Sequence, residues 1–564
     1  EPIASARVEG LSRRADLEIA IATAGAHTIA LVYDGGTKDH VATVVATWPS
    51  PITPAVALVV GARQATTVRA SLSTSRPPPE PREQHPSEWT VELARETPLP
   101  RAIGRFFRRV ARGTRSTTYV TRTVGASLLE EHAVPTLRVH PGVGHRFRDA
   151  TFDARLARSL DARGRPVFVE GLKDPVLVER ALRALERAHR KNARVVEIGR
   201  SREARPILAL VVARDLDERA RPALLLVGGH HADEVSTPEP PLDAAKRVLE
   251  GARDARGRRV LDTFTLVVVP LVNPDGSHVH WHVRDDLGRT NLAKDDEAAR
   301  DGLSIYGVDL NRNYPTGFGS VDDRFNSSDP RSRFFRGVAP ASEPEVRAIL
   351  ALADEHRFVA ALSYHASATR ILVPYTVPGL EDPSPSAAWS VARALVDTVP
   401  DAAPGRRYQA IRNLYPVSGT DQDALYARHG TLAFLVELPA RAPTRTLSLD
   451  ALVAGSRPLW MFLVERWLAG PSLDVTVRGG GDDVAVSVDE IAWKNGERHT
   501  VHPLTRRARA YLPSIGAYTV RARAADGRET FAVVDAREGV TSVALSLDAA
   551  SSDASTSDAT TAAD

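Results

Sequence analysis

The sequence contains no cysteine among its 564 residues. This absence excludes a disulfide framework, a thiolate nucleophile and a zinc site built from cysteine ligands. A bound metal ion would therefore need histidine and carboxylate ligands. Long apolar runs are missing too. None approaches the ~20 residues of a transmembrane helix, so the sequence predicts no membrane span.

Charge of one sign is not in excess either. The chain has 73 Lys and Arg residues against 70 Asp and Glu residues, a formal net charge of +3. No basic stretch interleaved with aromatic residues is present, so we expect no nucleic-acid partner. The length corresponds to three or four domains at about 150 residues each. No pattern in the sequence indicates an oligomeric state.

An initiator methionine is absent as well, because the first residue is Glu1. A secretion signal removed by cleavage would leave such a start, and so would a chain trimmed for another reason. We therefore expect a secreted or periplasmic protein.

The N-terminal part of the chain alternates apolar and polar residues with a period of two, which is typical of strands. Residues 27–33 and 41–48 show this pattern on either side of a turn signal at 34–36. We expect a β-rich domain over residues 1–75. Residues 76–165 begin with a proline-rich stretch and are expected to hold a linker and a region that no pattern assigns.

The C-terminal part returns to the same alternation. Over residues 471–550 it includes two segments that flank the turn signal Asp526-Gly527, and we expect a small β-sandwich accessory domain there. Residues 551–564 contain only Ser, Thr, Ala and Asp. This tail cannot bury enough apolar surface to order itself, so we expect it to be disordered.

Residues 166–470 instead alternate helical and strand patterns. Continuous apolar runs, typical of strands buried on both faces, occur at 223–227, 264–269, 358–363 and 431–436. Apolar residues have helical spacing at 176–192 and 452–468, and Ser342–Glu345 has the pattern of a capping box. The predicted fold class is α/β, a mixed and mostly parallel sheet with helices on both faces.

Polar residues that suit a metal ion follow two of these apolar runs. His231 and Glu234 lie three residues apart just after the first run, and His365 ends the segment after the third. Because ligands bind beyond the carboxyl ends of strands in open α/β sheets, these side chains are candidates for one zinc site. His230 and Asp233 form a rival pair in the same loop.

Glu437 directly follows the apolar run 431–436. A carboxylate in that position is costly unless it has a partner or a role. The segment Asn273–Gly276 is a further polar signal at the end of a strand of this kind.

The order of these motifs resembles the zinc metallocarboxypeptidases, a family of funnel-shaped peptidases. The matching segments are, in chain order, Ile198–Ile207, His231-x-x-Glu234, Asn273–Gly276, Gly307–Asn313, Ser342–Glu345, Ser363–His365, Pro374-Tyr375, Tyr415 with Ser418–Thr420, and Val436–Leu438. Each motif alone is modest, but so many in one order are specific. The C-terminal domain, through Gly516–Val520, resembles the transthyretin-like modules that follow some carboxypeptidase domains.

The resemblance implies that one zinc ion per chain is held by His231, Glu234 and His365. It implies that Glu437 is the general base of a reaction that hydrolyses the C-terminal peptide bond of peptides or proteins. Asp309 would orient His231 and fix its tautomer.

The resemblance also implies a substrate-binding set. Asn311 and Arg312 would grip the terminal carboxylate of the substrate, and Tyr415 would close over it. Arg289 is our candidate for the arginine that stabilises the oxyanion, with Arg284 as its rival.

The position that would set specificity falls at Gln422, between Asp421 and Asp423. These two acids cap the helix that begins there, or they form an acidic pocket for a basic C-terminal residue. The sequence leaves both interpretations open.

Two other functions remain open on the same scaffold. One is a zinc amidase acting on cell-wall peptides or N-acyl amino acids, which the presence of Asn311, Arg312 and Tyr415 disfavours. The other is a non-catalytic binding module, which the full ligand set and Glu437 disfavour.

Overall fold

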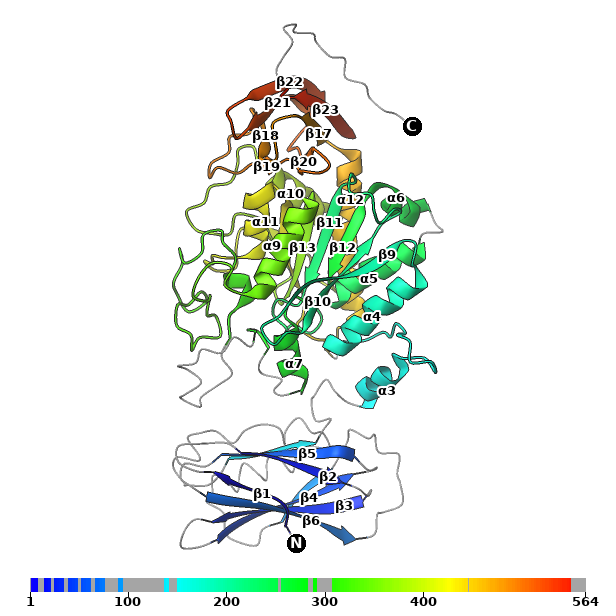
Figure 1. Cartoon of the computed structure of the whole chain (residues 1–564), viewed down its shortest axis with the longest axis vertical. Helices are drawn as coiled ribbons and strands as arrows, with labels where there is room; N and C mark the ends of the chain where they lie inside the picture. The colour runs from blue at the N-terminus through cyan, green and yellow to red at the C-terminus, as the bar shows by residue number, and fades with distance from the viewer. Residues whose placement is uncertain are drawn as a thin grey trace. The chain divides into compact units, whose positions relative to one another are not determined.

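The structure is a computed structural model of the chain, shown in Figure 1. It describes eight strands between residues 2 and 141, and residues 150–548 apart from 252–254, 283–287, 292–306 and 445. The predicted tail 551–564 lies outside the described residues. The chain divides into two compact units. The first comprises Glu1–Arg158 with two short later segments, and the second comprises the remainder. In these described parts no helix is long and apolar enough to cross a membrane.

The first unit contains two antiparallel sheets. Its strands are β1 (Pro2–Val8), β2 (Ala15–Ile21), β3 (Gly25–Asp34), β4 (Asp39–Trp48), β5 (Ile52–Gly61), β6 (Thr66–Arg76), β7 (Thr90–Ala94) and β8 (Thr136–Pro141). One sheet has the order β1-β6-β3-β4-β7 and the other β2-β5-β8. The helix α3 (Ala150–Arg158) follows.

Strands β7 and β8 fall inside residues 76–165, which we expected to hold a linker and an unassigned region. β7 pairs with β4 and β8 pairs with β5, so both belong to the N-terminal sheets. Both segments lie beyond the proline-rich stretch that predicted the linker, in the part of the range that no pattern assigned. Such short edge strands are defined by partners far away in the sequence, which a local pattern does not reveal.

An eight-stranded mixed sheet forms the centre of the second unit. Its order is β15-β14-β16-β13-β11-β12-β10-β9. These strands are β9 (Ala193–Arg200), β10 (Pro206–Val212), β11 (Ala223–Gly228), β12 (Thr265–Val269), β13 (Ala360–Ala366), β14 (Arg370–Leu372), β15 (Gln409–Ile411) and β16 (Leu432–Leu438). The four central strands β16, β13, β11 and β12 run parallel. They come from the four apolar runs that predicted them.

Helices cover both faces of this sheet (Figure 1). They are α4 (Pro175–Ala188), α5 (Glu239–Glu250), α6 (Ala255–Thr263), α9 (Pro344–His356), α10 (Ala387–Thr398), α11 (Asp421–His429) and α12 (Leu449–Ala469), with the short 3₁₀ helix η3 (Leu310–Arg312). A further helix, α7 (Pro274–His282), follows β12. Alternate strand residues divide between two cores. Leu224 and Leu226 share one with α4, α5, α10 and α12, and Leu225 and Val227 share the other with α9 and α11. The predicted α/β class is confirmed.

Some of these helices begin at a residue whose side chain caps the first turn, and others do not. Asp174 accepts a hydrogen bond from the Leu177 amide at the start of α4, and Ser448 accepts one from the Ala451 amide at the start of α12. The capping box expected at Ser342–Glu345 is wrong. Glu343 is the cap residue of α9 and makes no capping hydrogen bond with its side chain, because that carboxylate binds Arg202 instead.

The C-terminal strands form two further sheets, β20-β17-β23 and β19-β18-β21-β22. They are β17 (Ser472–Arg478), β18 (Val484–Val488), β19 (His499–Thr500), β20 (Arg507–Tyr511), β21 (Gly516–Ala524), β22 (Glu529–Ala536) and β23 (Val540–Ser546), and they enclose one apolar core. His502 Nε2 lies 2.8 Å from the Glu355 carbonyl oxygen, and Arg509 donates to the Arg221 carbonyl at 3.3 Å. Both carbonyls precede the first residues of β13 and β11, so these sheets contact the end of the central sheet where its strands begin.

Candidate metal centre and substrate site

The loop after β11 holds two of the predicted ligands in a tightly packed turn. Gly229 has φ +67°, and a Cβ at Gly228 would lie 2.3 Å from the Thr237 carbonyl oxygen. Glycine is therefore required where the chain leaves the strand and reverses. The Thr237 hydroxyl accepts from the Gly229 amide at 3.1 Å and donates to the Glu234 carbonyl at 2.8 Å. This turn brings His231 and Glu234 to the carboxyl end of the sheet.

His231, Glu234 and His365 converge there. His231 Nδ1 lies 3.1 Å from Glu234 Oε1 and 3.1 Å from His365 Nδ1, and His365 Nδ1 lies 3.4 Å from Glu234 Oε2. All three side chains are buried. Zinc bonds of about 2.0–2.1 Å in a tetrahedron place the ligand atoms about 3.3–3.4 Å apart. The spacing of these donors therefore fits one zinc ion.

Asp309 lies behind His231 and determines which of its nitrogens faces the other ligands. The Asp309 carboxylate lies 2.9 Å from His231 Nε2 and accepts a hydrogen bond from Arg289 Nε at 2.9 Å. Burial alone would raise the pKa of Asp309, but the Arg289 guanidinium, together with His231 and Arg312, holds it well below its usual value. An ionised Asp309 accepts from Nε2–H, which leaves the Nδ1 lone pair of His231 for a metal ion.

The rival pair His230 and Asp233 does not form a metal group. His230 Nε2 lies 2.8 Å from the Tyr314 hydroxyl, and Asp233 binds two arginines. His230 does fall in a second possible group with His365 and Asp421, but its nearest Asp421 oxygen is 3.7 Å away. Burial lowers the pKa of His230 to about 4, so it is neutral at pH 7.

Glu437 lies on β16 directly opposite His365 in the parallel register of β13 and β16. It is less buried than the three ligands. Burial raises the pKa of its carboxyl, as does the charge of Glu234, while His231, Arg289 and Arg441 oppose the rise. A dication held by the three ligands would oppose it further, so the carboxylate form would be available to accept a proton.

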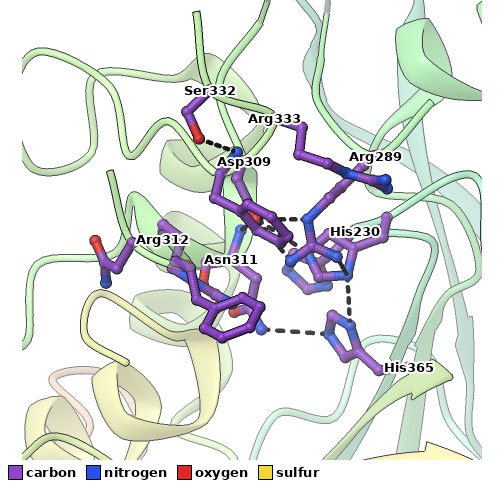
Figure 2. Close-up of polar contacts among 12 residues, drawn as sticks. His230, Arg289, Asp309, Asn311, Arg312, Ser332, Arg333 and His365 are labelled. Carbon is purple, nitrogen blue, oxygen red and sulfur yellow. Dashed lines mark hydrogen bonds and ion pairs between the residues drawn. The ribbon is translucent and has the colours of Figure 1, made fainter. Parts of the chain in front are cut away.

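Arg289 lies beside this group, and Figure 2 shows it with Asp309 and His365. Its Nη1 lies 3.3 Å from His231 Nδ1 and 3.9 Å from Glu234 Oε1. The guanidinium also lies over the Phe334 ring, 4.6 Å from its centre. Of the two candidates for the oxyanion arginine, Arg289 lies next to the ligands, and Arg284 lies outside the described residues.

Asn311 and Arg312 come from η3, which follows Asp309 (Figure 2). Asn311 Nδ2 lies 3.5 Å from His365 Nε2, and Asn311 Oδ1 accepts from the Asp421 amide at 2.9 Å. Arg312 donates to the carbonyls of Phe325 at 2.8 Å and of Asn311 at 2.6 Å. Because a guanidinium has five N–H groups, three remain for a carboxylate.

Two phenylalanines that the sequence did not single out connect these side chains. Phe325 stacks on Tyr415 with ring centres 4.3 Å apart and meets Phe334 edge to face at 5.5 Å. The Phe325 carbonyl also holds Arg312. The pair thus links Tyr415 with the Arg289 side of the site. Both residues lie in a loop without periodicity, and aromatic residues in a polar loop were the only available signal.

The acids beside Gln422 have separate surroundings. The cap residue of α11 is Thr420, the Asp421 carboxylate accepts no hydrogen bond from the described residues, and Asp423 binds Thr376 outside the helix, so the capping interpretation, one of the two left open, is wrong. Asp423 accepts from the Thr376 amide at 3.0 Å and the Thr376 hydroxyl at 2.6 Å. Those bonds keep it from serving as the wall of an acidic pocket.

Gln422 Nε2 also donates to the Thr376 hydroxyl, at 3.2 Å. Among the described residues, Gln422 Oε1 and both carboxylate oxygens of Asp421 are buried without a hydrogen-bond donor.

Comparison with known proteins agrees with this geometry. Residues 178–448 match the family model of the zinc carboxypeptidases. Carboxypeptidase A6 of Mus musculus is 28% identical over 250 residues, which are 43% of this chain and 55% of the relative. Carboxypeptidase A5 of Macaca fascicularis is 31% identical over 181 residues, which are 32% of this chain and 39% of the relative. The matched segments span about half the length of these curated relatives.

Among solved structures, carboxypeptidase A from Helicoverpa armigera is similar to this chain with a TM-score of 0.46. It is 22% identical and covers 60% of this chain and 83% of its own.

Proposed function

We propose that this protein releases the C-terminal residue of peptides or proteins by zinc-dependent hydrolysis, because residues 178–448 match the family model of the zinc carboxypeptidases. One observation carries the proposal. Three buried donors lie at the mutual spacing of zinc ligands, with the carboxylate of Glu437 in register beside one of them. Secretion stays a prediction.

His231 Nδ1, Glu234 and His365 Nδ1 would hold one zinc ion per chain. When bound, zinc lowers the pKa of a water molecule and polarises a carbonyl group, which suits hydrolysis at neutral pH. Asp309 keeps His231 in the tautomer that offers Nδ1, and the Ala366 amide donates to Glu234 Oε2 at 2.9 Å and fixes that carboxylate.

The side chains around the centre would divide the remaining work. Glu437 accepts the proton of the attacking water at its carboxylate and returns it to the departing amine. Arg289, charged and held by Asp309, donates N–H groups to the oxygen on which negative charge develops.

Recognition of the substrate's end would fall to Asn311 and Arg312. The planar guanidinium of Arg312 matches a carboxylate with two parallel hydrogen bonds, and its position is fixed by the carbonyls of Phe325 and Asn311. Tyr415, which stacks on Phe325, would cover the bound residue.

The test combines metal content with a panel of N-blocked peptides that carry either a free or an amidated C-terminus. A carboxypeptidase contains one zinc per chain and releases the last residue only from free-acid peptides. An amidase acting on the same centre would cleave both sets, or neither. If the protein contains no zinc and cleaves no peptide, the results favour a non-catalytic binding module instead.

A further inference from the structure

Asp233 anchors two arginines at the edge of the candidate site. Its Oδ2 accepts a hydrogen bond from Arg333 Nη2 at 3.3 Å and from Arg441 Nη1 at 3.1 Å. The Asp233 side chain is only 9% exposed, whereas those of Arg333 and Arg441 are 52% and 46% exposed. The carboxylate is thus enclosed while both guanidinium groups face solvent. We call Arg333 and Arg441 the arginine rim.

The arginine rim is assembled from separate loops around the metal centre. Asp233 immediately precedes the ligand Glu234 in the loop after β11. Arg441 lies four residues after Glu437, and its backbone carbonyl accepts from the Ser236 amide at 3.0 Å. The Arg333 guanidinium lies 5.6 Å from the centre of the Phe334 ring. Arg289 lies over that same ring.

The rim carries an excess of positive charge. Two guanidinium groups share one carboxylate, and in the described contacts each gives Asp233 a single N–H. Each guanidinium has five N–H groups in a planar fork. Several donors of Arg333 and Arg441 therefore remain for a second carboxylate, which the planar fork of a guanidinium group matches.

The direction of the substrate follows if the proposed function is correct, and this inference rests on it. Figure 2 shows Arg312 and Arg333 on opposite sides of Asp309 and Asn311. A peptide whose terminal carboxylate lies at Arg312 and whose last peptide bond lies at the metal would continue away from Arg312, and Arg333 lies on that side of Asp309 and Asn311 in this view. The residues before the cut bond would then pass the arginine rim.

We propose that the arginine rim selects peptides with an acidic residue on the N-terminal side of the bond that is cut. The carboxylate of that residue would bind between Arg333 and Arg441. Both arginines are partly exposed, so the gain is moderate and sensitive to salt.

The experiment uses the full zinc-loaded chain and three N-blocked peptides that differ only in the residue before the cut bond, which is Glu, Gln or Lys. We expect kcat/KM for the Glu peptide to exceed that for the Gln peptide by about two- to fivefold, with Lys lowest. The difference should appear mainly in KM. It should shrink at 1 M salt, where the screening length falls to about 3 Å.

The double variant Arg333→Gln with Arg441→Gln should bring the three peptides to similar kcat/KM. Arg537→Gln is the matched control. This arginine is exposed in the turn between β22 and β23, in the C-terminal part that contacts the opposite end of the central sheet, and its loss should leave the Glu preference intact. Equal rates for Glu and Gln peptides, or a preference that survives in the double variant, would overturn the inference.

A binding measurement separates this inference from the proposed function. Zinc-loaded Glu437→Gln protein is titrated with the same peptides by calorimetry, with no cleavage required. If no peptide loses its last residue with the wild type but the Glu peptide binds tighter than the Gln peptide, the carboxypeptidase proposal fails and the rim assignment stands. If the last residue is released but the two peptides bind and react equally, only the rim assignment fails.

Discussion

His365 and Glu437 are register partners on the parallel strands β13 and β16. Neighbouring strands lie about 4.8 Å apart, and residues in register project to the same face of a sheet. A candidate metal ligand and the proposed proton acceptor are thus fixed side by side by main-chain hydrogen bonds rather than by flexible loops. The following predictions test whether these two side chains and their neighbours have the proposed roles.

Removal of one ligand should abolish metal binding. In His365→Ala we expect the zinc content, measured by elemental analysis after dialysis, to fall from one per chain to near zero, because two remaining donors cannot complete a zinc site. His189→Ala removes a histidine at the end of α4 and should leave the content unchanged. A His365→Ala protein with full zinc content would contradict the ligand assignment.

Glu437→Gln separates binding from chemistry. The amide has nearly the same shape as the carboxylate but cannot accept the proton, so we expect kcat to fall by roughly 10²–10⁴-fold. Zinc content and melting temperature should stay near the wild-type values, since Glu437 is not among the converging ligands. Near-normal kcat in this variant would mean that another group is the base.

Asp309→Asn should weaken the metal site without touching a ligand. The amide is a poorer acceptor for His231 Nε2–H and leaves the buried Arg289 without its carboxylate partner. Loss of such a partner typically costs about 10–100-fold in metal affinity. Zinc affinity is measured by competition with a chelator. An unchanged affinity would show that His231 is oriented by something other than Asp309.

The central sheet and the polar residues at its strand ends could be predicted from the sequence, because both leave a signal within a short stretch of residues. Strands buried on both faces read as continuous apolar runs, and a polar residue at the end of such a run stands out. His231, His365 and Glu437 all occupy positions of this kind. The carboxyl ends of parallel strands meet at one edge, so proximity of these residues could be inferred without coordinates.

Contacts between parts of the chain that are far apart in the sequence could not be predicted in the same way. Asp423 looked like a helix cap, but it binds the backbone of Thr376 from a position 47 residues away. Asp233 looked like a rival ligand, and instead anchors Arg333 and Arg441, which are 100 and 208 residues distant. A polar residue in an irregular loop has no period that would indicate its partner.

Gln422 and Asp421 are expected to give the protein a preference for a basic residue at the C-terminus of the substrate. The free oxygen of Gln422 is buried, as are those of Asp421, so they would accept hydrogen bonds from a cationic side chain. We expect kcat/KM to be higher for peptides ending in Lys or Arg than for those ending in Phe or Glu. Gln422→Leu should lower the value for the Arg peptide by about tenfold, since hydrogen bonds to charged groups contribute about 1.5–3 kcal/mol. A clear preference for Phe or Glu would contradict this use of Gln422.

Recognition of the free terminal carboxylate decides between a carboxypeptidase and the other substrate classes. Arg312 is fixed by the carbonyls of Phe325 and Asn311, and a charge-assisted pair with the substrate carboxylate would contribute about 1.5–3 kcal/mol. Amidation of the substrate removes one partner and leaves Arg312 unpaired. We expect kcat/KM to fall by at least about tenfold, since about 1.4 kcal/mol corresponds to that factor.

Combining the Arg312→Ala substitution with amidation of the substrate gives a cycle of two changes, made separately and together. The substitution should severely reduce cleavage of the free-acid peptide and hardly change cleavage of the amidated one, so that the effects of the two changes do not add. Arg312→Lys should restore only part of the loss, because an ammonium group lacks the planar fork that pairs with both carboxylate oxygens. If the wild-type protein cleaves free and amidated peptides equally well, Arg312 does not read a terminal carboxylate, and the same centre must serve an amidase or an endopeptidase.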